Sequence, residues 1–242
     1  MKAMILAAGL GTRLRPLTDE RPKALVEISG RTLLDITLER LRGSGVSEVI
    51  VNVHHFADMV VEHLEANENF GMRIEVSREE TLLDTGGGLR KAAWFFLEGD
   101  SPDEPFVLHN VDVISTIDLE RMIGHHRSRE SLATLAVEER GTSRQLLFDE
   151  RAQLCGRRRA DGRTELVGSP HHPLGLGFSG IHVISPRLLP MMRDEGVFSI
   201  IDEYLGLASR RQKIVAFRAD EYSWRDIGTP ESLKQAVQDK RA

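Results

Sequence analysis

The chain opens with a short apolar segment that runs directly into a glycine-containing loop. Residues 2–7 predict a buried β-strand, and the loop A-G-L-G-T-R-L-R-P-L-T follows at residues 8–18 and leads to Lys23. A loop in this place presents backbone N–H groups to which a phosphate can bind. Gly9 and Gly11 allow a positive φ and carry no Cβ that would block a ligand. The pattern predicts a phosphate-binding loop at the end of a strand.

Two common phosphate-binding motifs do not fit this loop. The dinucleotide fingerprint requires a third glycine where this chain has Leu14, and Pro16 interrupts the helix that should follow. The P-loop requires Gly-Lys followed by Ser or Thr, which the N-terminal region lacks. The loop instead carries Arg13, a planar fork, and leads to Lys23, a compact point charge.

Strand-like and helix-like segments alternate through the first half of the chain. β-Strands are predicted at residues 48–53, 73–77 and 106–110, with helices between them and a helix at 87–96 that begins at a glycine triplet. Repeated βα units of this kind indicate a mainly parallel sheet that is covered on both faces. The later segments predict shorter strands at 133–137, 145–148 and 153–157, a hairpin turn at Asp161-Gly162, a strand at 177–184, and a last helix from Pro230.

Composition and length restrict the class of protein. The chain has 242 residues and a net charge of −5, which argues against a nucleic-acid partner. No apolar run approaches the ~20 residues that span a bilayer, so no membrane association is expected. The one cysteine, Cys155, cannot form an internal disulfide. We expect a cytoplasmic protein with one domain over residues 1–242, in which about 133–185 form a substrate-facing subregion.

The long N-terminal pattern resembles the signature of the sugar-1-phosphate nucleotidylyltransferases. Further matches are D-T-G-G-G at residues 84–88 and Asp112, Gly180 and Asp226. The resemblance is strongest to the short, single-domain branch, which includes N-acetylmuramate-1-phosphate uridylyltransferases and mannose-1-phosphate guanylyltransferase-like proteins. It implies a three-layer, Rossmann-like α/β/α fold with a mainly parallel mixed sheet and, given where the last helix ends, no C-terminal β-helix domain.

The resemblance implies that a nucleoside triphosphate, with UTP or GTP favoured, and a sugar 1-phosphate are the partners. Arg13 is then expected along the β- and γ-phosphates, and Lys23 between the α-phosphate and the sugar phosphate. The nucleotide-binding residues that it implies are Ala8, Gly9, Gly11, Thr12, Asp84, Thr85, Gly86 and Gly87. Asn52 and His54, at the end of the second predicted strand, either line the same site or simply cap the strand.

The resemblance also implies a Mg²⁺ site held by Asp112 and Asp226. Asp112 follows a predicted strand at its carboxyl end, where open α/β sheets bind ligands, and Asp226 lies in W-R-D-I-G-T-P-E at residues 224–231. Magnesium accepts one or two carboxylates together with substrate phosphates. Val111 stands where the family usually has glycine, and it would be strained by ~1–3 kcal/mol if this position required a positive φ.

For the sugar phosphate, the resemblance points to Gly180 and Asp202. The Glu-Lys-Pro motif that supplies a phosphate-binding lysine in many relatives is absent, and Arg157 is the candidate replacement. It lies in a run with Arg158 and Arg159, and on a strand the side chains of 157 and 159 would share one face. The same run could equally be a solvated surface.

Two other functions stay open at this stage. Residues 110–112 could be the metal motif of a glycosyltransferase of related fold, although such an enzyme would not need Arg13 and Lys23. The chain could also be a catalytically silent nucleotide-sugar-binding subunit, since Val111 and the missing Glu-Lys-Pro motif depart from the family. The nucleobase, the sugar and the oligomeric state are not determined by the sequence.

Overall fold

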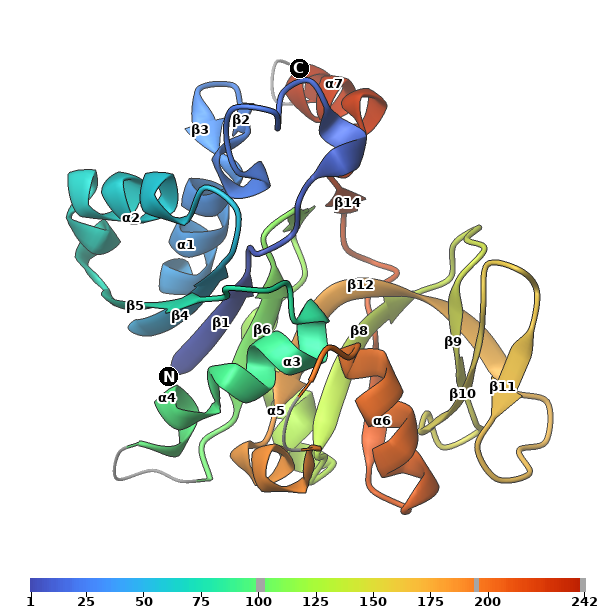
Figure 1. The fold of residues 1–242 in the computed structure, drawn as a ribbon. Coiled ribbons are helices and arrows are strands. Elements are labelled where there is room, and N and C mark those ends of the chain that lie inside the picture. Colours follow the sequence, from blue (N-terminus) through green and yellow to red (C-terminus); the bar gives the residue numbers. More distant parts are fainter. Residues whose placement is uncertain (99–102, 194–195, 240–242) are drawn as a thin grey trace.

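The computed structural model describes residues 1–98, 103–193 and 196–239. Most of its strands belong to one ten-stranded mixed sheet, with helices on both faces (Figure 1). The strands are β1 (Lys2–Leu6), β2 (Glu27–Ile28), β3 (Arg31–Thr32), β4 (Glu48–Val53), β5 (Arg73–Arg78), β6 (Phe106–Asn110), β7 (Val113–Ser115), β8 (Ala133–Glu138), β9 (Gln145–Phe148), β10 (Leu154–Arg158), β11 (Thr164–Leu166), β12 (Leu174–Ile184), β13 (Ile214–Arg218) and β14 (Trp224–Asp226). The α-helices are α1 (Leu33–Gly43), α2 (Ala57–Ala66), α3 (Asp84–Lys91), α4 (Ala93–Leu97), α5 (Leu119–Ser128), α6 (Ile200–Ser209) and α7 (Pro230–Asp239). The 3-10 helices are η1 (Thr12–Leu14), η2 (Lys23–Leu25), η3 (Glu68–Gly71) and η4 (Pro186–Met191).

One side of the sheet consists of parallel strands in the order β5-β4-β1-β6, which we call the parallel part. These strands are buried runs of β-branched and aliphatic residues, as expected for strands covered on both faces. Successive side chains of these strands point to opposite faces of the sheet and pack into two hydrophobic cores. Ala3 and Ile5 pack with Leu38 of α1 on one face, whereas Met4 packs with Leu89 of α3 on the other. The predicted three-layer α/β/α arrangement is therefore confirmed.

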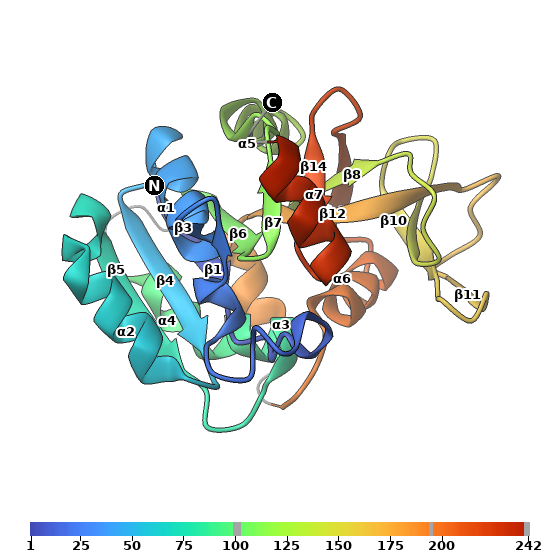
Figure 2. The same cartoon turned by 90° about the horizontal axis from the view of Figure 1, so that it is seen from above.

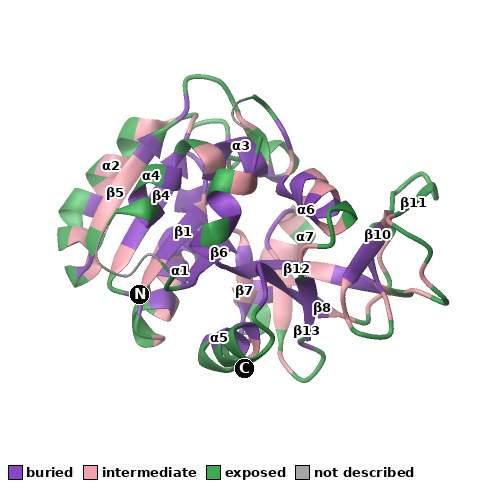
Figure 3. Ribbon diagram, turned by 90° about the horizontal axis from the view of Figure 1, so that it is seen from below, coloured by how far each residue is buried: buried purple, intermediate pink, exposed green. Residues whose placement is uncertain are grey.

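The other side of the sheet contains the antiparallel strands β8 to β12, which we call the antiparallel part. Strand β13 extends this side and pairs in parallel with β8. Strand β12 joins the two parts, because it pairs antiparallel with β6 at one end and with β9 at the other. Its register with β8 shifts between Phe178 and His182, where Gly180 has a φ of +73°. The hairpin strands β9, β10 and β11 project from the body of the molecule (Figure 2), and β11 is fully exposed (Figure 3).

The last strand and helix of the chain, β14 and α7, lie near the loop that follows β1. Strand β14 pairs with β7 in a separate two-stranded sheet, and α7 follows it. Figure 1 shows α7 at the same end of the molecule as the loop after β1. Residues that lie more than 200 positions apart in the sequence thus reach one site. In the part of the chain that the structure describes, no helix is both long and apolar enough to cross a membrane.

The predicted elements differ from the observed ones in several places. The helix expected over residues 87–96 is two helices, and α3 begins at Asp84, so the glycine triplet lies inside the helix rather than at its start. The strand expected at 153–157 is shifted to Leu154–Arg158. Helix α5 was not predicted, although Asp118 caps it by accepting a hydrogen bond from the Arg121 N–H at 2.9 Å. The turn at Asp161-Gly162 joins β10 to β11 as expected, with a φ of +82° at Gly162.

Candidate active site

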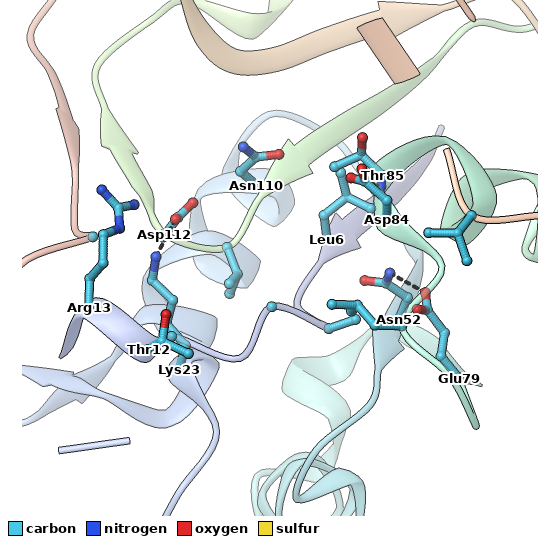
Figure 4. A pocket seen from close by; sticks show the side chains of 17 residues that line it. Leu6, Thr12, Arg13, Lys23, Asn52, Glu79, Asp84, Thr85, Asn110 and Asp112 are labelled. Atoms are coloured by element: carbon cyan, nitrogen blue, oxygen red, sulfur yellow. Dashed lines mark hydrogen bonds and ion pairs between the residues drawn. The ribbon is translucent and has the colours of Figure 1, made fainter. Parts of the chain in front are cut away.

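A cavity of about 440 Å³ opens at the carboxyl ends of the parallel strands (Figure 4). This is where open α/β sheets bind ligands. Five elements meet there: the loop after β1, η2, the ends of β4 and β6, and the start of α3. We call it the loop cavity, and its lining includes the predicted residues Ala8, Gly9, Gly11, Thr12, Arg13, Lys23, Asp84, Thr85 and Asp112, together with Asn52.

The loop after β1 contains one position whose backbone conformation requires glycine. Gly11 has a φ of +63°, and a Cβ on it would lie 2.9 Å from Cγ2 of Thr18, so only glycine fits there. The Thr18 hydroxyl donates a hydrogen bond to the Gly11 carbonyl at 2.9 Å and fixes the turn. Gly9 does not have a positive φ. The space around its Cβ position is empty, so the backbone is open to the cavity there.

Lys23 and Arg13 reach the cavity from two sides. Lys23 begins η2 and is buried, with 8% of its surface exposed, and its Nζ contacts Oδ2 of Asp112. Arg13 is exposed and lies against Gly228, where a Cβ would come within 2.6 Å of Nη2. Glycine at 228 therefore leaves the room that the guanidinium of Arg13 occupies. A buried lysine and an exposed arginine thus face the same cavity.

Asp112 and Asp226 are brought together by the β7–β14 ladder. The Ile227 N–H donates to the Asp112 carbonyl at 2.7 Å, and Asp226 pairs in register with Val113. Burial raises the pKa of Asp226, and the negative charge of Asp112 raises it further, while Lys23, Arg13 and Arg140 act in the opposite direction. Two neighbouring carboxylates that repel each other favour binding of a cation.

These carboxylates fit a divalent ion that completes its coordination with substrate phosphates. Among the described residues, no group of three or more His, Cys, Asp or Glu side chains could hold a metal by itself. Magnesium is bound in proteins by one or two carboxylates plus phosphate oxygens, so Asp112 and Asp226 meet that requirement only when a phosphate is present.

Val111 does not strain the site. It has no positive φ, and it is buried in the core at 4% exposure. Its N–H donates to the Leu6 carbonyl at 3.1 Å, which continues the pairing of β1 with β6 past the end of the ladder. The strain that we considered for a β-branched residue here is thus absent, and the side chain contributes to packing instead.

A buried polar network, which the sequence did not reveal, supports the far wall of the loop cavity. The Ala7 N–H donates to Oδ1 of Asn52 at 2.7 Å, and Nδ2 of Asn52 donates to Oε1 of Glu79 at 2.7 Å. Oε2 of Glu79 accepts from the Leu83 N–H at 2.9 Å. Asn52 is 2% exposed and Glu79 4%. This network ties the loop after β1 to the segment that enters α3.

Nothing in the sequence distinguishes Glu79 from its neighbour Glu80, because both follow a strand in the same acidic context. Asn52 was recognised as a candidate from its place at the end of a strand, and it does line the cavity. His54 lies close by, and its Nδ1 is 2.8 Å from the Glu79 carbonyl oxygen, so its ring helps to hold the same segment.

The glycine triplet of α3 is explained by packing. A Cβ on Gly86 would collide with the Phe198 ring, and one on Gly87 would collide with the Gly196 carbonyl. A Cβ on Gly88 would lie 2.8 Å from both Asn52 and Glu79. Gly86 and Gly87 thus lie behind the lining that Asp84 and Thr85 form. Their expected contact with a nucleotide stays a prediction.

A second cavity, of about 650 Å³, lies between the antiparallel part and the start of α6. We call it the arginine cavity because five arginines line it: Arg140, Arg144, Arg157, Arg158 and Arg159. Asp226 also lines it, whereas Asp112 lines the loop cavity. The two carboxylates that influence each other therefore face different cavities, and the boundary between the cavities lies at this pair.

Of the three residues predicted to bind the sugar phosphate, Arg157 lines the arginine cavity, whereas Asp202 and Gly180 line neither cavity. Arg157 lines the arginine cavity, but its Nη1 donates to Oδ1 of Asp202 at 2.5 Å and its Nε to Glu165 at 2.7 Å. Arg157 and Arg159 both bind Glu165, so they share a face as the strand alternation predicted. Gly180 lies outside both linings and makes room for Asn110, whose Nδ2 would be 2.8 Å from a Cβ there.

Arg140 is a residue of this site that the sequence did not reveal. Its guanidinium lies over the ring of Trp224, 3.7 Å from the ring centroid, and its Nη2 donates to the Phe178 carbonyl at 2.5 Å. It also contacts Glu138. The stacking explains why a tryptophan precedes Asp226 by two positions. A cation is thereby fixed beside the carboxylate of Asp226, whose pKa it lowers.

Comparison with known proteins agrees with this geometry. Residues 2–145 match the family model described as nucleotidyl transferase. The chain is 34% identical to N-acetylmuramate alpha-1-phosphate uridylyltransferase of Caulobacter vibrioides, over 95% of this chain and 93% of that protein. It is 30% identical to mannose-1-phosphate guanyltransferase beta-B of Xenopus laevis, over 96% of this chain but only 62% of the longer relative.

Solved structures share the fold. A putative glucose-1-phosphate thymidylyltransferase from Bacillus anthracis superposes with a TM-score of 0.81 at 18% identity, covering 100% of this chain and 95% of that one. HddC from Yersinia pseudotuberculosis gives a TM-score of 0.77 at 23% identity, with 99% of both chains covered. With the family match and the similarity to the uridylyltransferase over nearly the whole of both chains, the chain belongs to the nucleotidyl transferase family and is a sugar-1-phosphate nucleotidylyltransferase.

Proposed function

We propose that the enzyme binds UTP or GTP in the loop cavity, receives a sugar 1-phosphate through the arginine cavity, and joins them at the boundary between the two. The observation that carries this proposal is the position of Asp112 and Asp226, which influence each other across that boundary while each lines a different cavity. The choice of nucleotides follows the relatives, which include a uridylyltransferase and guanyltransferases.

The reaction is an in-line displacement at the α-phosphorus of the nucleotide. An oxygen of the sugar phosphate forms a bond to that phosphorus, the bond to the β-phosphate oxygen breaks, and pyrophosphate leaves with the electron pair. The attacking oxygen is already ionised at neutral pH, so no side chain has to remove a proton. What the protein must supply is alignment and compensation of charge between two anions.

Lys23 is placed to hold the α-phosphate and the incoming phosphate together, because it is buried and its Nζ already lies at Asp112. Arg13 is exposed at the rim and suits the departing β- and γ-phosphates. The backbone around Gly9 and Gly11 gives the phosphates close access to main-chain N–H groups. Near Asp84 and Thr85 the cavity leaves space for the nucleobase.

Asp112 and Asp226 would hold a divalent ion such as Mg²⁺. When bound, it would compensate negative charge on the phosphates as a Lewis acid. In its absence, Lys23 already contacts one of these carboxylates and part of the charge is compensated.

The antiparallel part, about residues 133–185 of a single domain, forms the sugar side. Arg140 is positioned beside Asp226 to bind the 1-phosphate. Arg157 and Asp202 bind each other at 2.5 Å and would contribute hydrogen bonds to the sugar as a fixed pair rather than as a free cation. Gly180 acts indirectly, through the room that it leaves for Asn110. A reducing, cytoplasmic compartment supplies nucleoside triphosphates and suits the single buried thiol of Cys155.

The proposal is tested by incubating the protein with each nucleoside triphosphate and a set of sugar 1-phosphates in the presence of Mg²⁺, and by measuring pyrophosphate and nucleotide sugar. We expect equal amounts of both products with UTP or GTP. A glycosyltransferase would instead consume a nucleotide sugar and release a nucleoside diphosphate. A catalytically silent subunit would bind the nucleotide without turnover, and either outcome would refute the proposal.

A further inference from the structure

Two of the five arginines that line the arginine cavity have no carboxylate partner among the described residues. Three of its five arginines contact carboxylates within the described residues. Arg140 contacts Glu138, and both Arg157 and Arg159 bind Glu165. Arg157 also binds Asp202. These pairs account for the positive charge of three of the arginines in the lining.

The remaining two arginines lack such compensation. Nη1 of Arg158 donates to the side-chain oxygen of Gln145 at 2.8 Å, and that partner is neutral. In the part of the chain that the structure describes, the guanidinium of Arg144 has neither an ion pair nor a hydrogen bond. Arg144 immediately precedes Gln145, and Gln145 pairs with Arg158 across β9 and β10. The two unpaired cations therefore belong to one corner of the cavity wall.

The 1-phosphate of the sugar does not account for this corner. That phosphate must lie at the Asp112–Asp226 boundary, where Lys23 and Arg140 are available to it. Arg144 and Arg158 are exposed: Arg144 comes directly before β9 and Arg158 ends β10. Both strands belong to the projecting hairpin (Figures 1 and 2). When the phosphate of the sugar lies at this boundary, the opposite end of the sugar lies near Arg144 and Arg158.

We propose that the sugar substrate carries a carboxylate in addition to its 1-phosphate, and that Arg144 and Arg158 bind this carboxylate. The inference rests on the proposed function and specifies its substrate class as acidic sugar 1-phosphates. Arginine binds carboxylates through two parallel N–H···O bonds, and two uncompensated guanidinium groups on adjacent chain segments suit one such group. A neutral sugar would leave both cations without a charged partner.

Two matched pairs of substrates test this inference. Glucuronate 1-phosphate and glucose 1-phosphate form the first pair, and N-acetylmuramate 1-phosphate and N-acetylglucosamine 1-phosphate form the second. In each pair one member has a carboxylate that the other lacks. For each sugar, kcat/KM is measured from pyrophosphate release with UTP and with GTP. The enzymes compared are the wild type, the double variant Arg144→Gln/Arg158→Gln, and Arg151→Gln as control. Arg151 is an exposed arginine of the same hairpin that lies outside the cavity.

We expect the wild type to prefer the acidic member of at least one pair by tenfold or more, as charge-assisted hydrogen bonds to a carboxylate require. The double variant should reduce this ratio at least tenfold, and Arg151→Gln should keep it within twofold. Equal or better use of the neutral member in both pairs overturns the inference. It is also overturned if the double variant lowers kcat/KM equally for both members, since the arginines would then serve the 1-phosphate. Absence of pyrophosphate with every sugar is a different result, which refutes the proposed function itself.

Discussion

The two parts of the sheet build their cavities in different ways. In the parallel part, the ends of β1, β4 and β6 converge, and the polar groups that shape the loop cavity are buried and hydrogen-bonded, as in the chain from Ala7 through Asn52 to Glu79. In the antiparallel part, the wall of the arginine cavity comes from exposed side chains of a projecting hairpin. The nucleotide side is therefore fixed by the core of the fold. The sugar side depends on side chains that can change without disturbing that core.

The largest effect is expected at the boundary of the two parts. Asp112→Asn and Asp226→Asn should each lower turnover by about 10²–10³-fold, the loss that follows removal of one charge-stabilising group in a reacting site. Both variants should keep the far-UV circular dichroism spectrum of the wild type, because neither side chain packs in a core cluster. Full activity of both variants in excess chelator would show that no metal acts between the two cavities.

The two cations of the loop cavity should have the next largest effect. We expect Lys23→Ala to lower kcat by about 10²-fold with both substrates saturating, since it removes a group placed between the reacting phosphates. Arg13→Ala should have a smaller effect, mainly in the step in which pyrophosphate leaves. Lys213→Ala, at an exposed lysine far from the cavity, is the control. If both variants only raise KM at unchanged kcat, the cations bind ground and transition states equally and the assignment is wrong.

On the sugar side, Arg140→Gln should raise KM for the sugar 1-phosphate about tenfold and leave KM for the nucleotide within twofold, because a charge-assisted hydrogen bond is lost on one side only. Arg140→Lys should fail to restore the wild-type value, since a lysine neither stacks as a planar group on Trp224 nor reaches Phe178 as a fork. Arg218→Gln, at an exposed arginine paired with Asp220, serves as control. A rise in KM for both substrates would mean that Arg140 supports the site as a whole.

The smallest expected effect concerns the line along which the two parts join. His109 of β6 and His182 of β12 lie in paired strands, and burial lowers the pKa of each to about 3. The unfolded chain, with histidine pKa values near 6.5, binds more protons than the folded chain below that pH. Stability should therefore decrease as the pH falls from about 6.5 towards 3, by roughly 1.4 kcal/mol per pH unit for each histidine.

This prediction is checked by urea unfolding between pH 7 and pH 5. The variant His109→Gln should show a shallower decrease than the wild type, because one buried imidazole with a lowered pKa has been removed. A wild-type stability that stays constant over this range would show that these histidines do not couple the two parts to pH.

The sequence predicted the parallel part better than the antiparallel part, for a physical reason. Strands such as β4 and β6 are continuous apolar runs whose ends carry polar groups, so Asn52 and Asp112 could be located from their position after a strand. Arg140 and Glu79 could not be located in this way, because each is positioned by a partner far away in the sequence. Arg140 stacks on Trp224, and Glu79 accepts a hydrogen bond from Asn52. A Cβ at Gly86 or Gly87 would meet protein atoms, which explains these glycines by packing, and their contact with a nucleotide stays a prediction.

The most direct test of the two-cavity account is a crystal structure of the enzyme with the nucleotide sugar that it produces. The account predicts the base near Asn52 and Thr85, the two phosphates between Lys23 and the Asp112–Asp226 pair, and the sugar in the arginine cavity beside Arg140. A structure in which base and sugar both occupy the loop cavity, with the arginine cavity left to solvent, would contradict it.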